Sequence, residues 1–462
     1  MQKGGIMEEE KVSQEILDRN RTANEIIELM QKEVDEYDGP IMLLRSGGPI
    51  PLYEIAEAIV RSEKVKFYKE NFYLYKDGVY IKDTTGMLDK KIFLLNKEFS
   101  KSERNEIKEY IKLIADVTEV QNVDYYINFK NCILNVETLE KIEHDSEMFF
   151  LNQINANYNE QIDRNEYIDK FLNDVTSNNE KRKQAILQII GYCMTTSLDF
   201  QKAFVFYGPT AENGKSVLVD VIGHLIGEDN TSHISIHELQ NGRFYAAELT
   251  NKLLNIVAEL PRNHLKSVEV FKSIVTGDAM SVEEKYKNRY SIKPYAKNIF
   301  TANELPRVDD NSEGYFRRLN ICKFEAKFTE EEKRNFNKRK LLTQEALDYL
   351  AFISVKAYNE LLNSNSMYFA NEDESNEIVE KYRQENNSAL SFISSEYIKN
   401  KLSNGESIDR PEIYSIYKNW CSENGYKAKG RNKFYAEIES QNLLEMKYDN
   451  GYPKYRRNTD MW

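Results

Sequence analysis

One glycine-containing segment, AFVFYGPTAENGKSVLVDVIGHLIG at residues 203–227, carries residue types suited to phosphate chemistry. An apolar run ends at Gly208, turn-forming residues follow, and Gly214-Lys215-Ser216 begin a stretch with helical periodicity. In such a loop the backbone amides surround phosphate oxygens, the lysine reaches the β- and γ-phosphates, and the serine hydroxyl binds Mg²⁺. The spacing is unusual, because five residues rather than four separate Gly208 from Gly214. We therefore predict a site for ATP and Mg²⁺ formed by Gly208, Asn213, Gly214, Lys215, Ser216 and Val217.

Two further polar residues follow apolar runs downstream of this loop. Glu259 follows the run LLNIVA, and Asn303 follows KNIFTA. A nucleotide hydrolase needs a carboxylate at the end of a neighbouring strand, and we expect Glu259 to polarise the attacking water and to join Ser216 in binding Mg²⁺ through water. Ala258 stands where a second acid is common, so Glu259 would act alone. Asn303 is predicted to hydrogen-bond the attacking water or the γ-phosphate. Taken alone, each residue is more often part of an ordinary loop or turn, and the phosphate loop upstream is what favours the functional interpretation.

Arg317 and Arg318 are adjacent in GYFRRLNICKF, just before another predicted strand. A guanidinium can neutralise charge on a transferring phosphoryl group, and a neighbouring subunit can supply it. Two adjacent arginines without further context are more often surface charges. We include both among the candidate catalytic residues.

Basic residues gather in two other places. Lys285, Lys287 and Arg289 form the tip of a predicted hairpin, interleaved with tyrosines, which suits a sequence-independent grip on single-stranded nucleic acid. The stretches KAKGRNK (427–433) and KYRR (454–457) are predicted to form a wing around an Asn-Gly turn that contacts the DNA backbone. An ordinary solvated surface explains either cluster equally well. The second group of candidate DNA contacts is Lys427, Lys429, Arg431 and Lys433.

These residues need a framework that brings strand ends together. From 201 to about 325, short apolar runs alternate with helical stretches, which predicts an α/β core with a parallel sheet. We divide the chain into an N-terminal α+β accessory or collar region (1–165), a helical lead-in with the nucleotide-binding motor (166–385) and a C-terminal module (386–462). The polar passage at 363–377 is the best linker candidate.

Composition excludes several classes of protein. The net charge of −12 argues against a protein that coats nucleic acid with its whole surface, but it permits a local basic channel. We expect neither a membrane span nor a signal peptide, and hence a cytoplasmic protein. The histidines form no metalloprotease motif, and we expect reduced, buried thiols at Cys132, Cys193, Cys322 and Cys421.

The order of these motifs resembles superfamily 3 helicases, and more closely the helicase part of phage and plasmid primase-helicases, whose relatives include the poxvirus primase-helicase. The resemblance rests on GPTAENGKS, NIVAEL, KSIVTGDAMSVEEKYK, YAKNIFTANELP and GYFRRLNICKF. Weaker similarity covers the regions on either side, including a winged-helix-like C-terminal module. The primase part is apparently missing, since no Asp-x-Asp pair or zinc-finger spacing precedes the motor.

The resemblance implies an AAA+-like P-loop NTPase core and an ATP hydrolase coupled to DNA unwinding. Such proteins work as homo-hexameric rings that translocate 3′-to-5′ on single-stranded or forked DNA. It also implies roles for Glu259 as hydrolytic acid, Asn303 as sensor, one of Arg317 and Arg318 as a finger acting between subunits, and Lys285 and Lys287 as pore-loop contacts. We expect a replication helicase of a phage or mobile genetic element in a bacterial host cell, served by a separate primase or other replication proteins. The alternative is an origin-binding AAA+ initiator or helicase loader without processive unwinding.

Overall fold

The computed structural model describes residues 44–45, 48–117, 123–210, 212–241, 243–260, 265, 267–283, 289–308, 312–402, 406–440, 444–449 and 452–457. The chain forms two compact units, one of residues 1–135 and 140–154 and the other of residues 136–139 and 155–462. Within the described residues, no helix is long and apolar enough to span a bilayer. All four cysteines are buried and free, as predicted.

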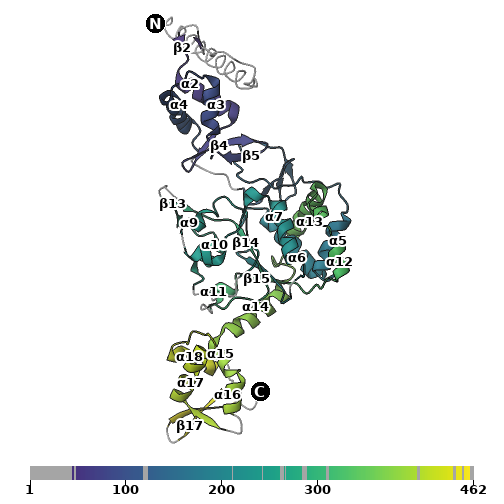
Figure 1. Ribbon diagram of the computed structural model, residues 1–462, viewed down its shortest axis with the longest axis vertical. Helices are drawn as coiled ribbons and strands as arrows, with labels where there is room; N and C mark the ends of the chain where they lie inside the picture. The colour runs from purple at the N-terminus through teal and green to yellow at the C-terminus, as the bar shows by residue number, and fades with distance from the viewer. Residues whose placement is uncertain are drawn as a thin grey trace. The chain divides into compact units, whose positions relative to one another are not determined.

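The first unit combines short antiparallel sheets with helices. Its helices pack around an apolar core that includes Ile59, Ile92 and Ile111. Asp77 and Gly78, both with positive φ, form the tight turn of the predicted hairpin at 72–83, which is confirmed as two paired strands. The elements of this unit are β1 (Leu44–Arg45), β2 (Gly48–Pro49), α2 (Leu52–Glu63), β3 (Lys66–Tyr68), β4 (Asn71–Lys76), β5 (Val79–Lys82), α3 (Met87–Leu95), α4 (Lys101–Ile114), β6 (Tyr126–Asn128), β7 (Ile133–Asn135) and β8 (Lys141–Ile142) (Figure 1).

A parallel sheet of five strands organises the second unit and confirms the predicted α/β core. The strands lie in the order β10 (Thr231–Ser232), β11 (Leu254–Val257), β14 (Lys297–Ala302), β9 (Ala203–Tyr207) and β15 (Leu319–Lys323). Tyr207 pairs with Ala302, and Val257 with Phe300, so β9, β11 and β14 end at the same edge. Residues at that edge converge although they are far apart in sequence.

Helices cover both faces of this sheet. Val205 and Ile321 face α10 (Glu269–Thr276) and α14 (Glu372–Asn386), whereas Phe204 contacts Tyr192 of α6 (Glu180–Cys193) on the opposite face. The remaining helices before α14 are α5 (Glu166–Val175), α7 (Lys215–Ile226), η2 (Glu228–Asn230), α8 (Ile236–Asn241), α9 (Arg243–Ala247), α11 (Glu313–Phe316), α12 (Glu330–Asn335), η3 (Lys338–Leu342) and α13 (Gln344–Leu362). Successive residues of a strand point to opposite faces, so the buried residues of this sheet pack against helices on both sides.

The predicted hairpin between β11 and β14 is present. β12 (Met280–Val282) pairs with β13 (Tyr290–Ile292) in antiparallel fashion. Its tip, including Lys285 and Lys287, lies outside the described residues.

The C-terminal segment has a core of its own, which includes Phe392, Tyr417 and Phe434. It consists of α15 (Ser388–Ile393), α16 (Glu396–Lys401), β16 (Ser407–Asp409), α17 (Arg410–Glu423), α18 (Arg431–Ser440), β17 (Leu444–Asp449) and β18 (Tyr452–Arg457), with the sheet order β16-β18-β17. KYRR lies on the predicted hairpin, but KAKGRNK does not. Residues 427–430 lie in the connection between α17 and α18, and Arg431 begins α18.

The linker predicted at 363–377 is wrong. Phe369 is buried against Phe204, and α14 begins at Glu372. Asn371 Nδ2 donates to Asn320 Oδ1 at 3.0 Å, and the hydroxyl of Ser375 accepts from the backbone amide of Ile321 at 2.8 Å. This polar segment is therefore packed on the motor, because the side chains of Asn371 and Ser375 satisfy polar groups of β15.

Gly191 of α6 packs directly against α13. A Cβ at this position would lie 2.4 Å from Cβ of Tyr358 and 2.5 Å from the carbonyl oxygen of Ser354. We expect Gly191→Ala to destabilise the fold by about 1–3 kcal/mol, although alanine normally favours a helix. Thermal melting followed by circular dichroism measures the effect. The control is Gly430→Ala, where an added Cβ meets nothing within 4 Å; equal melting temperatures for the two variants would contradict the prediction.

Candidate active site

The predicted phosphate loop connects β9 to α7 at the carboxyl edge of the sheet. The amide of Gly208 donates to the carbonyl oxygen of Ala302 at 3.0 Å, which holds the start of the loop beside β14. Gly214, the residue before α7, has φ +86°, a conformation that glycine adopts without strain. A Cβ at Gly208 would lie 2.3 Å from Nδ2 of Asn213 and 2.4 Å from the carbonyl oxygen of Phe324. Both glycines are therefore required by this loop, one for its φ and one for space.

The Lys215 ammonium lies at the centre of this arrangement. Its Nζ donates to the carbonyl oxygen of Gly208 at 3.0 Å, to Oδ1 of Asn213 at 2.9 Å and to Oδ1 of Asn303 at 3.2 Å. Lys215 is only 6% exposed, and burial lowers the pKa of its amine. These acceptors, and the carbonyl oxygen of Thr210 at 3.5 Å, are neutral, so they satisfy the ammonium's hydrogen bonds without balancing its charge. A bound anion such as a phosphate would supply that charge.

Asn213 positions both the loop and the lysine. Its amide nitrogen donates to the carbonyl oxygens of Thr210 at 2.8 Å and Phe324 at 3.3 Å, while its Oδ1 accepts from Lys215. The loop is thereby tied to the end of β15. The backbone carbonyl oxygens of Thr210 and Phe324 are site components that the sequence analysis missed, since no residue pattern identifies a backbone acceptor.

The carboxyl ends of the strands also hold the remaining predicted site residues, Ser216, Val217 and Glu259. Ser216 is exposed in the first turn of α7 and Val217 is half-buried. Glu259 is exposed two residues beyond β11, and the next amide, that of Leu260, donates to the carbonyl oxygen of Thr301 at 2.7 Å. This bond carries the Glu259 segment along β14 towards Asn303. Among the described residues, no group of three or more His, Cys, Asp and Glu side chains forms a metal site. An exposed serine hydroxyl and one carboxylate instead fit Mg²⁺, which keeps several waters and binds phosphates.

Arg317 and Arg318 lie at the opposite side of the sheet, where the strands begin. Leu319, the first residue of β15, pairs with Ala203, the first residue of β9, and the Ala203 amide donates to the carbonyl oxygen of Arg318 at 2.7 Å. Five strand residues, about 16 Å, separate this edge from the phosphate loop. Arg317 is exposed; burial, reinforced by the charge of Arg317, lowers the pKa of Arg318. One chain therefore does not bring these arginines together with Lys215.

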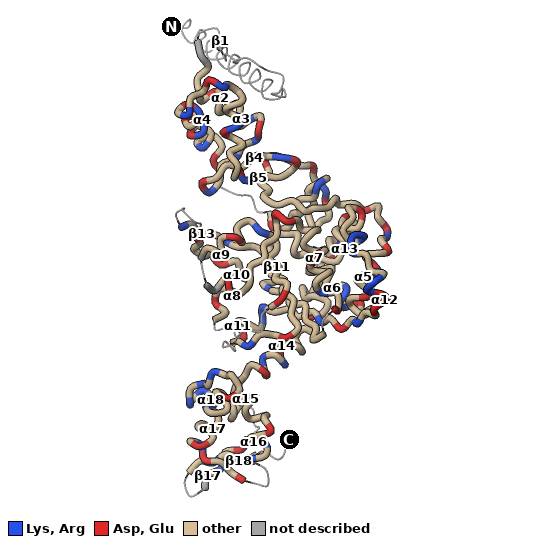
Figure 2. The backbone as a smooth tube through the Cα atoms, viewed as in Figure 1, with Lys and Arg blue, Asp and Glu red and all other residues tan. Residues whose placement is uncertain are grey.

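The basic clusters are only partly available for binding. Arg289 pairs with Glu283 of its own hairpin at 3.2 Å. Lys429 forms an ion pair with Glu437 and donates to Oδ1 of Asn387 at 2.8 Å. Lys427, Arg431 and Lys433 are exposed beside the start of α18, and Figure 2 shows the basic positions there.

Comparison with known proteins relates separate segments of the chain to family models. A family of unknown function, DUF5906, matches residues 206–318. A model described as D5 N terminal like matches residues 60–177, and one described as Poxvirus D5 protein-like matches residues 384–462. Each match covers less than half of the chain, so the similarity is established segment by segment.

Individual relatives are distant. The chain is 25% identical over 235 residues to "Putative helicase L207/L206" of Acanthamoeba polyphaga mimivirus, a match that covers 48% of this chain and 24% of that protein. The matched part is thus about a quarter of that relative's length. Two apo structures of the NrS-1 C-terminal region match with TM-scores of 0.53 and 0.51 at 14% and 15% identity, over 88% of this chain and 98% of theirs. At this identity the likeness concerns the fold alone.

The space at Gly208 allows a direct test of the phosphate loop. We expect Gly208→Ala to lower the affinity for a non-hydrolysable ATP analogue with Mg²⁺ at least tenfold, because the added Cβ must displace the Asn213 amide that orients Lys215. Isothermal titration calorimetry measures this affinity, again with Gly430→Ala as the control. Unchanged affinity in a folded Gly208→Ala variant would refute the assignment of the loop.

Proposed function

We propose that this protein is an ATP-dependent DNA helicase of the superfamily 3 type that translocates on single-stranded DNA, 3′-to-5′ and as a hexameric ring, during replication of a phage or mobile genetic element. The observation that carries the proposal is the buried Lys215 ammonium, held by neutral acceptors between the phosphate loop and Asn303. The D5-like segment matches and the mimivirus relative, which is named as a helicase, support a role in replication.

In this proposal the loop amides and Lys215 bind the phosphates of ATP. Ser216, with Glu259 through water, holds Mg²⁺, and the ion neutralises phosphate charge when bound. Glu259 polarises the attacking water. Asn303 uses its amide to orient the water or the γ-phosphate, and its present hydrogen bond to Lys215 supports that position.

The position of the arginines supports the proposed assembly into a ring. Arg317 and Arg318 lie at the sheet edge away from the chain's own phosphate loop. In a head-to-tail ring, this edge of one subunit can face the nucleotide of the next, where a guanidinium stabilises the transferring phosphoryl group. The separation of the two edges within one chain supports action between subunits.

DNA contacts are assigned to two elements. Lys285 and Lys287 lie in the sequence between β12 and β13, outside the described residues, and we propose that this hairpin grips the translocated strand. The C-terminal elements follow the order helix, strand, two helices and hairpin, which supports a winged-helix-like module with α18 as its recognition helix. A separate primase and other replication proteins would complete the system in the cytoplasm of a bacterial host.

A second candidate is an origin-binding initiator or helicase loader. It is favoured by the basic residues Arg431 and Lys433 in the first turn of α18, where a recognition helix contacts base edges in duplex DNA. The two candidates differ in which DNA activates the ATPase.

Steady-state ATP hydrolysis with and without single-stranded DNA separates these candidates. We expect single strands of unrelated sequence to stimulate hydrolysis several-fold, and Lys215→Ala to abolish both basal and stimulated turnover because it removes the phosphate-binding charge. An unwinding assay on a forked DNA substrate then tests whether ATP hydrolysis is coupled to strand separation. Stimulation by one duplex sequence alone would favour the initiator, and hydrolysis that survives Lys215→Ala would refute the proposed site.

A mixing experiment tests action between subunits. We expect Arg317→Ala or Arg318→Ala to lower kcat by roughly 10³-fold with little change in nucleotide affinity, since a finger acts on the transition state. Mixing that variant with Lys215→Ala should restore part of the activity, because some interfaces would then pair an intact lysine with an intact arginine. If neither arginine variant changes turnover, the finger assignment fails.

A further inference from the structure

Two large aromatic side chains are exposed near the tip of the C-terminal hairpin. Tyr448 of β17 is 70% exposed and Tyr452 of β18 is 71% exposed, and in the sequence they flank the predicted Asn-Gly turn. Within the described part of the chain, neither side chain contacts another ring or forms a hydrogen bond. Single exposed rings are common on a protein surface, whereas two at one tip mark a candidate binding site.

The strand register places the two rings on opposite faces of the hairpin. Tyr448 pairs with Pro453, and Tyr452 pairs with Asp449. Directly paired residues share a face and successive residues alternate, so Tyr448 and Tyr452 lie on different faces. A ribbon with a ring on each face can lie between two flat partners and contact both.

The face that carries Tyr448 continues the apolar core of the C-terminal module. Leu444 and Tyr455 lie on this face and belong to that core, and Met446 beside them is 37% exposed. Exposure therefore rises along β17 from the core to Tyr448. The ring is displayed by a strand whose other end is packed, rather than by a loop.

The tip extends past the third strand of its sheet. β16 ends at Asp409, where α17 begins, and its pairing with β18 reaches only as far as Lys454. β17 continues to pair with β18 at Pro453 and Tyr452. Two residue pairs, about 7 Å of ribbon, therefore extend beyond β16. Proline at 453 fixes φ within this extension, which stiffens it.

The other face combines a ring with positive charge. Tyr452, Lys454 and Arg456 follow one another at two-residue intervals and so share this face. Lys454 pairs with Asp409 at 3.7 Å, whereas Arg456 is exposed and forms no ion pair among the described residues. Aromatic side chains for bases, next to cations for phosphates, are the usual elements of a sequence-independent grip on unpaired nucleic acid.

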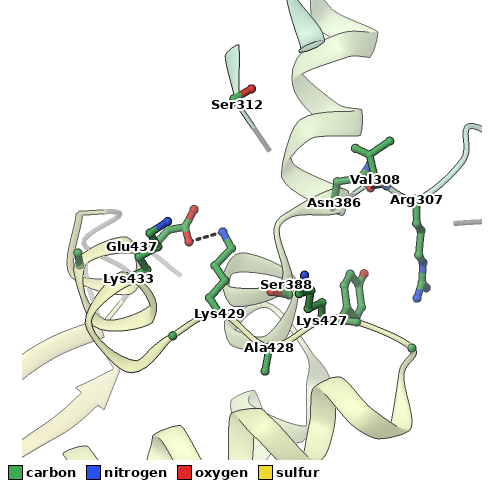
Figure 3. A pocket seen from close by; sticks show the side chains of 14 residues that line it. Arg307, Val308, Ser312, Asn386, Ser388, Lys427, Ala428, Lys429, Lys433 and Glu437 are labelled. Carbon is green, nitrogen blue, oxygen red and sulfur yellow. Dashed lines mark hydrogen bonds and ion pairs between the residues drawn. The ribbon is translucent and has the colours of Figure 1, made fainter. Parts of the chain in front are cut away.

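The connection before α18 is built differently. Lys429 and Glu437 form an ion pair there, as Figure 3 shows. Tyr426 stacks on Trp420 with ring centroids 5.2 Å apart, and the Arg307 guanidinium lies over the Tyr426 ring at 4.4 Å. Neighbours of the same chain therefore already occupy the ring of Tyr426. The rings at the hairpin tip have no such neighbours among the described residues.

We propose that the tip of the β17–β18 hairpin binds the junction between duplex and single-stranded DNA. One of its two rings, Tyr448 or Tyr452, stacks on the last base pair of the duplex, and the other stacks on the first unpaired base. The contact is independent of sequence, because every base offers a π-face. The inference rests on the proposed function, since a helicase creates such a junction. It adds an element between the separating strands to the predicted backbone contacts of this hairpin.

Fluorescence anisotropy tests this proposal with the full chain, without nucleotide, on a labelled fork and on a labelled single strand of the same sequence. We expect Tyr448→Ala/Tyr452→Ala to lower the ratio of fork affinity to single-strand affinity roughly tenfold, because the stacking contacts are lost. Tyr448→Phe/Tyr452→Phe should keep the wild-type ratio, because the rings remain. The matched control is Tyr368→Ala/Tyr397→Ala, two tyrosines outside the hairpin that are 65% and 54% exposed.

The possible outcomes separate this proposal from the proposed function. Equal ratios for the alanine variant and the control, or a wild type without preference for the fork, would overturn the assignment of the tip and leave the helicase proposal intact. A loss in the phenylalanine variant as large as in the alanine variant would overturn stacking in favour of the hydroxyl groups.

Sedimentation velocity of the same variants examines another occupant. If the alanine variant keeps the wild-type affinity ratio but forms smaller assemblies, the tip binds a second copy of the chain and the DNA assignment is wrong. A wild type that neither hydrolyses ATP faster with single strands nor unwinds the fork would instead overturn the proposed function, while the affinity ratio would still test the tip.

Discussion

The buried positive charge of Lys215 is the constraint on which the rest of the motor depends. An ammonium in a low-dielectric site is costly unless hydrogen bonds and an anion compensate it. Its acceptors come from the loop after β9 and from the end of β14, which meet because the two strands run parallel and end at one edge. The glycine at 208 leaves room for the Asn213 side chain, and the end of β15 anchors that side chain. Sheet order, loop geometry and the position of Lys215 therefore act together to accommodate its buried charge.

Much of this arrangement could be predicted from the sequence because it depends on local patterns. Apolar runs flanked by helical periods indicate buried parallel strands, and Gly214-Lys215-Ser216 indicates a loop that opens a helix. The positions of Asn303 and Glu259 after such runs place them at the carboxyl edge, as the strand register confirms. The roles proposed for them stay predictions.

The features that could not be predicted depend on partners distant in sequence. Asn371 and Ser375 have the composition of a linker, yet they hydrogen-bond β15 inside the motor. The KAKGRNK stretch looks uniformly basic, but the fold places Lys429 next to Glu437 and leaves its neighbours exposed. Arg307 belongs to no recognisable motif, because its contact with the Tyr426 ring joins residues more than a hundred positions apart. Composition describes each side chain by itself, whereas these roles arise from contacts between two side chains that the fold brings together.

The segment from Asn303 to Val308 has a mechanical consequence. Asn303 touches the lysine of the phosphate loop, and a few residues later Tyr382 donates to the carbonyl oxygen of Pro306 while Asn386 accepts from the Val308 amide. Both of those residues belong to α14, the helix that leads into the C-terminal module. Proline at 306 stiffens the connection, because its ring fixes φ. This connection is short and stiff. A displacement of Asn303 must therefore either be prevented by it or be transmitted to α14 as a movement along the chain.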